Sequence, residues 1–296
     1  MTTPPERFVW RKGYSADGRR YVGMVNGDFA ADGAVVWADA ATDAVERTFP
    51  APAMQVRLLE APDEGRTIRA VAGLRDDSTV VITWDVGTGA EARRAIRGPG
   101  AGFSRPLAFA PGGQAWAYLD KARDAVQVWD GAADRPLGPP LRTPSTARNL
   151  AAWAWAAALF APDGRTLILG RSDGQIEFWD LADFHLLRLV RLFPAGYTVM
   201  HLQITPDGRT LAASGNVLMT TTWAGRHWEG VRHFVTGEDI SEATREVVLL
   251  DLPTNRIIAR SPGSAAVEFA PDSRSAVTIE RDRSITIRDI PRPEAR

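Results

Sequence analysis

The chain reads Phe160-Ala161-Pro162-Asp163-Gly164, then the apolar stretch Thr166-Leu167-Ile168-Leu169-Gly170, and then Gln175-Ile176-Glu177-Phe178-Trp179-Asp180. In the first segment proline presets its own φ, Asp bonds the backbone two residues on and Gly tolerates positive φ, which predicts a tight turn. Ser172-Asp173-Gly174 is a second turn signal, of the kind that joins two strands of a hairpin. The last segment alternates apolar and polar residues, as a half-buried strand does. With Phe184–Val190 as a fourth strand, the stretch predicts four short antiparallel strands, the unit of a propeller blade.

This phrase, from turn to closing Asp, occurs six times along the chain. The copies run Tyr14–Asp39, Ala61–Asp85, Phe109–Asp130, Phe160–Asp180, Ile204–Asp251 and Phe269–Asp289. The closing Asp residues, at positions 39, 85, 130, 180, 251 and 289, are 46, 45, 50, 71 and 38 residues apart. Spacings of this size suit four-stranded blades, whereas helical repeats would show a 3.6-residue period that is absent here. The sequence predicts an all-β protein, a β-propeller of six four-stranded blades in a single domain over residues 1–296; a seventh, degenerate blade stays open.

Three dipeptides in the closing strands carry a family resemblance. Trp84-Asp85, Trp129-Asp130 and Trp179-Asp180, together with the Phe-Ala-Pro-Asp-Gly phrases, resemble the WD-repeat β-propeller family, and the chain looks most like its bacterial members with degenerate repeats. The resemblance covers roughly residues 8–290 and implies a scaffold for protein partners. The chain departs from the family where Ala38, Leu250 and Arg288 replace the Trp, and where Leu169 replaces the Ser or Thr of a hydrogen-bonded tetrad. We therefore expect that network to be absent from the fourth copy, and apolar packing between blades to hold the propeller.

Composition excludes several classes of protein. At 45% hydrophobic residues the chain can bury a substantial core, and it has no apolar run of the ~20 residues that cross a bilayer. Residues 1–7 have neither a basic start nor an apolar segment like those of a signal peptide, so we expect a cytoplasmic protein without membrane partners. The net charge is −1, from 35 basic and 36 acidic residues without a long single-sign run, and nucleic acid is not an expected partner. With no cysteine, disulfides and thiolate chemistry are excluded.

No motif of an enzyme or of a metal site stands out. None of the four histidines, His185, His201, His227 and His233, has the spacing of a metal ligand. No nucleophile elbow, phosphate loop or dinucleotide fingerprint occurs. Several Asp residues recur at one turn position, which indicates backbone capping rather than calcium binding; they are Asp17, Asp32, Asp163, Asp173 and Asp207. The sequence predicts no catalytic residue, no metal and no cofactor, and we expect a protein that is not an enzyme.

Most of the ten tryptophans are predicted to lie in the core. Five of them fall on predicted strands and should pack between blades: Trp37, Trp84, Trp116, Trp129 and Trp179. Trp155 is expected to pack as the chain enters the fourth blade. Trp153 lies nearer the loop and is a candidate exposed anchor for a partner.

The long interval before Asp251 contains the sharpest functional signal. Its surplus follows Ser214-Gly215-Asn216 and forms an insertion in the fifth blade at about 217–245, between the second and third strands. The insertion carries Trp223, Arg226, His227, Trp228, Arg232, His233 and Phe234. Trp and Arg are the residues most enriched at binding hot spots, and long insertions on a rigid scaffold are often functional. We take these residues and Trp153 as candidate partner-binding residues; local packing of the aromatics on the rim is the alternative.

The sixth copy differs from the others because its outer strand is missing. The first five have candidates for that strand: Val45–Phe49, Ala92–Ile96, Pro136–Leu141, Phe184–Val190 and Arg256–Arg260. After Asp289 the chain holds two prolines, Pro291 and Pro293, which cannot donate to a sheet. Either Thr2–Arg7 closes this blade, or the blade leaves an edge for another chain, including a second copy in a homo-oligomer.

Two functions of different classes fit these features. The first is a non-catalytic protein–protein interaction scaffold whose partner is a protein of unknown identity. The second is a six-bladed propeller hydrolase or small-ligand-binding protein that uses the central channel, which requires polar side chains on the innermost strands. Those strands are mainly apolar at Leu107, Ala156–Leu159, Leu202 and Val267, which favours the scaffold.

Overall fold

The computed structural model is all-β, with no α-helix in the part of the chain that it describes. It describes residues 9–15, 19–25, 33–51, 55–61, 65–73, 79–95, 104–111, 115–120, 125–131, 133, 135–142, 155–217, 245–264, 266–270, 272–279 and 285–291. These residues form six antiparallel sheets in two compact units, Met1–Arg142 and Thr143–Arg296. No helix within the described ranges is long and apolar enough to span a membrane.

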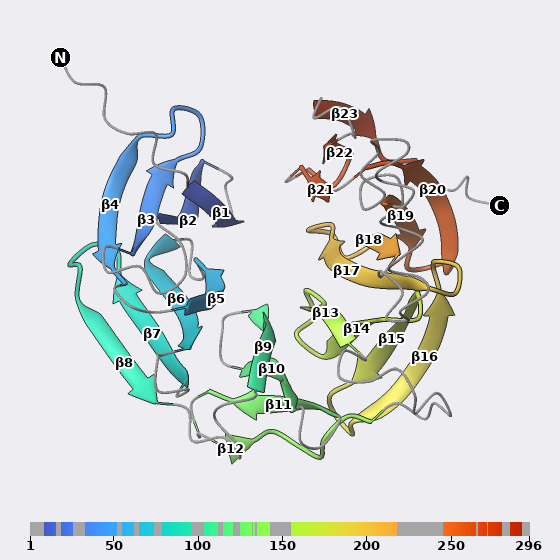
Figure 1. The fold of residues 1–296 in the computed structure, drawn as a ribbon, viewed down its shortest axis with the longest axis horizontal. Helices are drawn as coiled ribbons and strands as arrows, with labels where there is room; N and C mark the ends of the chain where they lie inside the picture. The colour runs from blue at the N-terminus through green and yellow to red at the C-terminus, as the bar shows by residue number, and fades with distance from the viewer. Residues whose placement is uncertain are drawn as a thin grey trace, which may run out of the picture. The chain divides into compact units, whose positions relative to one another are not determined.

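The first unit contains three four-stranded sheets, drawn in blue to green in Figure 1. The first sheet has β1 (Val9–Tyr14), β2 (Arg20–Val25), β3 (Ala34–Asp39) and β4 (Val45–Pro50). The second has β5 (Gln55–Glu60), β6 (Thr67–Gly73), β7 (Thr79–Asp85) and β8 (Glu91–Ala95). The third has β9 (Ser104–Phe109), β10 (Ala115–Asp120), β11 (Ala125–Asp130) and β12 (Arg135–Pro136). In each sheet the spatial order follows the order along the chain.

The second unit repeats this meander. The fourth sheet has β13 (Trp155–Phe160), β14 (Thr166–Arg171), β15 (Gln175–Asp180) and β16 (His185–Arg191). The fifth has β17 (Tyr197–Ile204), β18 (Thr210–Val217), β19 (Glu246–Asp251) and β20 (Arg256–Pro262). The sixth has three strands within the described residues, β21 (Ala266–Phe269), β22 (Ser275–Ile279) and β23 (Ile285–Asp289). The predicted all-β propeller architecture, built from four-stranded blades, is confirmed. The assignment of the whole chain to one domain with an insertion stays a prediction.

The predicted outer strands form in four sheets, as β4, β8, β16 and β20. The third sheet is the exception, because the predicted strand Pro136–Leu141 is only two residues long in β12 and is followed by a lone bridge from Leu141 to Val126. Pro139 and Pro140 have no N–H to donate, so the ladder cannot continue through them. In the first sheet, Val9 and Trp10 of β1 lie opposite Val25 and Met24 of β2.

Aromatic side chains of the closing strands are buried, and in the first unit they pack between neighbouring sheets. Trp84, Trp129 and Trp179 are 1%, 3% and 5% exposed, which confirms that they belong to the core. Trp37 and Trp116 are buried as well. Trp37 and Phe49 of the first sheet share an apolar cluster with Trp84 of the second, and the Phe49 and Trp84 rings lie 5.8 Å apart. The side chain of Trp155 is outside the described set, so its packing stays a prediction.

The turns close as the sequence predicts. The Asp163 carboxylate accepts the backbone N–H groups of Arg165 and Thr166 at 2.8 and 2.9 Å. In the same way, the Asp173 carboxylate accepts the backbone N–H of Gln175, and the Asp207 carboxylate accepts that of Arg209. The Gly that follows each of these Asp residues has a positive φ, between 64° and 80°, which L side chains rarely adopt. Asp17 and Asp32 lie outside the described residues.

The tetrad that needs a Ser or Thr is absent from the fourth sheet, where Leu169 has no hydroxyl, but a different buried polar network forms there. Glu177 is fully buried; its carboxylate accepts a hydrogen bond from Arg171 Nη1 at 2.7 Å and one from Trp179 Nε1 at 2.9 Å. Arg171 also donates to Asp173 at 2.9 Å. Glu177 lies opposite Leu169 in the ladder, and side chains two residues apart share a face, so Arg171 and Trp179 converge on Glu177. A Trp–Glu–Arg–Asp network therefore forms without the missing hydroxyl.

Candidate functional site

The candidate partner-binding residues cannot be placed by the structure. Trp223, Arg226, His227, Trp228, Arg232, His233 and Phe234 fall within 218–244, and Trp153 falls within 143–154, all outside the described residues. What the structure does show is the pair of strands from which the insertion departs. β18 ends at Val217 and β19 begins at Glu246, so residues 218–245 connect the second and third strands of the fifth sheet.

This base of the insertion is rigid. β18 and β19 pair without a break from Thr210 opposite Asp251 to Gly215 opposite Glu246, and Ala213 and Val248 between them are fully buried. A Cβ at Gly215 would meet the Phe193 ring at 2.8 Å, so only glycine allows this close approach.

The base is also tied to the fourth sheet. Arg260 of β20 donates to the Glu246 carboxylate at 3.0 Å and to the backbone carbonyl of Leu192 at 2.8 Å. Leu192 directly follows β16, so this one guanidinium joins the start of β19 to the end of the fourth sheet.

Two of the four histidines can be located. His185 begins the outer strand β16 and is exposed. His201 lies on β17, the innermost strand of its sheet. His227 and His233 belong to the insertion and lie outside the described residues.

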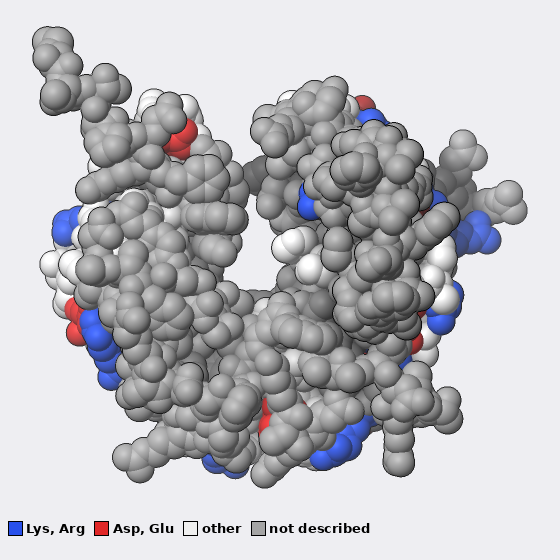
Figure 2. All heavy atoms as spheres, in the orientation of Figure 1, with Lys and Arg blue, Asp and Glu red and all other residues white. Residues whose placement is uncertain are grey.

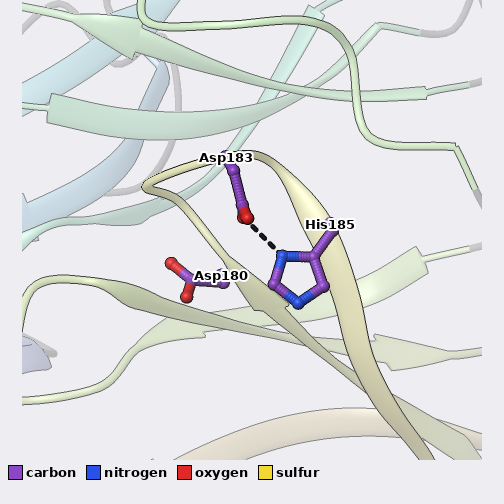
Figure 3. Close-up of side chains that lie close together, drawn as sticks. All are labelled: Asp180, Asp183 and His185. Carbon is purple, nitrogen blue, oxygen red and sulfur yellow. Dashed lines mark hydrogen bonds and ion pairs between the residues drawn. The ribbon is translucent and has the colours of Figure 1, made fainter.

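His185 belongs to a surface cluster with two carboxylates, shown in Figure 3. One ligand atom each from Asp180, Asp183 and His185 lies within 4.8 Å of the other two. The Asp183 carboxylate forms a hydrogen bond with the Nδ1 atom of His185. The Asp180 carboxylate forms hydrogen bonds with other groups. Arg165 binds both Asp180 oxygens at 3.0 and 2.9 Å, and the backbone N–H of Ala182 adds a bond at 2.8 Å. The Arg165 guanidinium, with the help of that N–H, lowers the pKa of Asp180 to about 2. Arg165 and the turn N–H therefore already occupy the Asp180 carboxylate, and we assign no metal to the cluster.

Charged side chains of both signs lie on the face of the molecule drawn in Figure 2. In Figure 2 the coloured atoms include basic and acidic groups close to one another, without a broad patch of one sign. This distribution agrees with the balanced composition of the chain.

Sequence analysis did not single out Arg188, which lines a groove between the fourth and fifth sheets. The groove has a volume of about 510 Å³, and most of its lining is apolar. In β16, Leu186, Arg188 and Val190 are half-buried, while the residues between them are exposed. The signal in the sequence is a cation between the apolar residues Leu186 and Val190, at a position where the alternation of the outer strand predicts an inward-facing side chain.

Comparisons with known proteins support the fold. No family model matches the chain. Over 172 residues the chain is 24% identical to Protein LST8 homolog of Drosophila melanogaster; the match covers 58% of this chain and 47% of that protein, so the chain spans about half the length of this relative. Among solved structures, Kuenenia stuttgartiensis hydrazine synthase aligns with a TM-score of 0.61 at 16% identity, over 97% of this chain and 78% of that chain. At such low identity the structural likeness shows a common fold and nothing about chemistry.

Proposed function

We propose that this chain is a non-catalytic protein-interaction scaffold, which presents the insertion at about 217–245 to a protein partner. One observation carries the proposal: a long connection rich in Trp and Arg leaves from two buried, fully paired strands. A rigid base limits the conformational freedom that binding must remove, and Trp and Arg are the side chains that most often dominate binding energy.

Two further features support this proposal. The resemblance to WD-repeat propellers favours a scaffold. The chain is also similar in sequence to Protein LST8 homolog over 172 residues. Some of the charged groups that the structure describes are turn caps or ion pairs, as at Asp163 and at Arg165 with Asp180. As part of the same proposal the protein works without a metal or cofactor, in the cytoplasm of a bacterium.

Deletion of the insertion tests this function. Residues 218–244 are replaced by a short Gly-Ser turn, and proteins that co-purify from the source organism are compared with those of the wild type. We expect the partner to be lost while the melting temperature changes little, because the base strands keep their pairing. A double variant, Trp228→Ala with Arg232→Ala, should lose the same partner with the connection intact. Retention of every co-purifying protein by both variants would refute the insertion as the binding surface, and Trp153→Ala would then be the next variant.

The sixth sheet leads to a second proposal, that β23 pairs with another strand. Within the described residues β23 has β22 on one side only. We propose that either residues 2–7 or a second copy of the chain completes this sheet, because exposed edges invite pairing. If residues 2–7 complete the sheet, their removal should lower the melting temperature or change the oligomeric state. If a second copy completes it, light scattering should show that the full-length protein is a homo-oligomer. A monomeric full-length protein whose melting temperature and oligomeric state are unchanged by the removal would contradict the proposal.

A further inference from the structure

The groove between the fourth and fifth sheets is bordered by two copies of the same turn. Pro162-Asp163 joins β13 to β14, and Asp207-Gly208 joins β17 to β18, so equivalent ends of the two sheets flank the opening. The walls between them are apolar and include Phe178, Leu187 and Leu252. At about 510 Å³ the groove is large enough for a few side chains, within the range of ligand pockets.

Arg188 is the only basic residue among those that line the groove. Its guanidinium carbon lies 4.1 Å from the centroid of the Phe178 ring, on which it stacks. The side chain is half-buried, and burial lowers the pKa of the guanidinium below its ordinary value. Within the described part of the chain it forms no hydrogen bond or ion pair.

The two carboxylates at the groove do not neutralise Arg188. Asp163 accepts from the N–H groups of Arg165 and Thr166 and from the Thr166 hydroxyl. Asp207 accepts from the Thr205 hydroxyl at 2.6 Å and from the Arg209 N–H at 3.0 Å. Both carboxylates cap their own turns, and burial alone accounts for the lowered pKa of Arg188. A partly desolvated cation without a carboxylate is costly, and an incoming carboxylate would offset that cost.

The next groove along the same unit has a different character. Between the fifth and sixth sheets the volume is about 270 Å³, and the lining is largely polar, with Asp251, Arg209 and Ser273. There the backbone N–H of Asp207 donates to the Ser273 hydroxyl at 3.1 Å, which joins the two turns. The larger groove therefore differs from its neighbour in combining apolar walls with an unsatisfied cation.

We propose that the groove between the fourth and fifth sheets docks a short segment of a partner protein that carries an apolar side chain next to a carboxylate. The apolar side chain packs against Leu187 and Leu252, and the carboxylate binds the Arg188 guanidinium, which lies over the Phe178 ring, through two hydrogen bonds. Leu187 and Leu189 are 49% and 46% exposed on β16, which extends the apolar surface beyond the groove. This inference rests on the proposed function, because the occupant is a protein. The groove is a surface separate from the insertion.

The test uses selection from a random library of short displayed peptides. The full-length wild-type protein selects binders, and binders that also adhere to the Arg188→Gln variant are removed. The survivors should contain Asp or Glu next to apolar residues. Their affinities for the wild type are then measured by fluorescence anisotropy, together with those of peptides in which the acid is replaced by its amide.

Arg188→Gln should weaken binding at least about tenfold, because it removes one partner of a desolvated charge pair. The amide peptides should bind weakly to both proteins and show no further loss with Arg188→Gln. The matched control is Arg256→Gln, an exposed position at the start of β20 outside the groove, which should bind as the wild type does. Circular dichroism and melting temperature check that each variant is folded.

Three results would overturn the inference: no peptide survives the depletion, the survivors lack acidic residues, or Arg256→Gln weakens binding as much as Arg188→Gln. The variant without residues 218–244 separates this inference from the proposed function. It should bind the selected peptides as the wild type does. If it keeps the peptides and also keeps every cellular partner, the insertion hypothesis fails while the groove stands.

Discussion

The fourth and sixth sheets carry the same turn-to-Asp phrase, yet their third strands differ in burial. Phe178 of β15 is 3% exposed, whereas Ile287, at the equivalent position two residues before the closing Asp of β23, is 72% exposed. Phe178 lies opposite Arg188 of the fourth strand, whose guanidinium covers its ring. Ile287 lies opposite Val277 of β22, and the described residues provide no strand on its other side. The phrase therefore specifies a strand, while the burial of that strand depends on what packs beside it.

The largest effect should come from truncating the aromatic residues of β15. Trp179→Ala removes a side chain that is 5% exposed, and such truncations cost roughly 3–5 kcal/mol of unfolding free energy. Trp228→Ala, in the insertion, should cost less than about 0.5 kcal/mol if that side chain lies at the surface. Urea unfolding followed by fluorescence measures both. Equal losses would show that Trp228 is also a core residue and that the insertion is structural.

The buried network of the fourth sheet should come next. Glu177→Ala leaves Arg171 with only Asp173 and leaves the indole N–H of Trp179 without its acceptor, which should cost ~3 kcal/mol. Glu91→Ala is the matched control, because Glu91 accepts from Trp84 Nε1 at 3.0 Å in a more exposed position. Its loss should be about 1 kcal/mol. If both variants unfold at the same urea concentration, the burial of Glu177 does not increase the contribution of its hydrogen bonds to the unfolding free energy.

These residues also show which parts of the fold and of the candidate sites the sequence predicts. Turn chemistry and strand alternation are local properties, so the six sheets, the capping Asp residues and the buried Trp residues could be predicted from the repeat. The network at Glu177 could not, because it depends on which residues face one another across β14 and β15. The groove at Arg188 could not be predicted either. The strand alternation indicates only that Arg188 faces inward, whereas the groove depends on how the fourth and fifth sheets pack against each other. The insertion residues remain sequence-based candidates.

Replacement of Ile287 sharpens the comparison of the two sheets directly. Ile287→Ser should change the unfolding free energy by less than about 0.5 kcal/mol, because the side chain is largely in solvent already. The matched change in the fourth sheet, Phe178→Ser, should cost several times more. If Ile287→Ser instead costs about 2 kcal/mol or more, a strand from this chain or from a second copy covers β23 in solution. Dilution of the protein distinguishes these two cases, since only the second depends on concentration.

The smallest effect concerns the pH dependence of the exposed pair between Arg165 and Asp180. The pKa of Asp180 is lowered from 3.8 to about 2, mainly by its hydrogen bonds to the Arg165 guanidinium. A carboxyl whose pKa is lower in the folded state stabilises the fold above its unfolded pKa, and this contribution disappears as the pH falls through the folded pKa. The melting temperature of the wild type should therefore exceed that of Asp180→Asn above about pH 4, and the two should converge between pH 4 and 2. Arg165→Gln removes the same pair from the other side and should converge with the wild type over the same range. A constant difference from neutral pH down to pH 2 would mean that the variants act through packing or turn geometry and that this ion pair does not contribute.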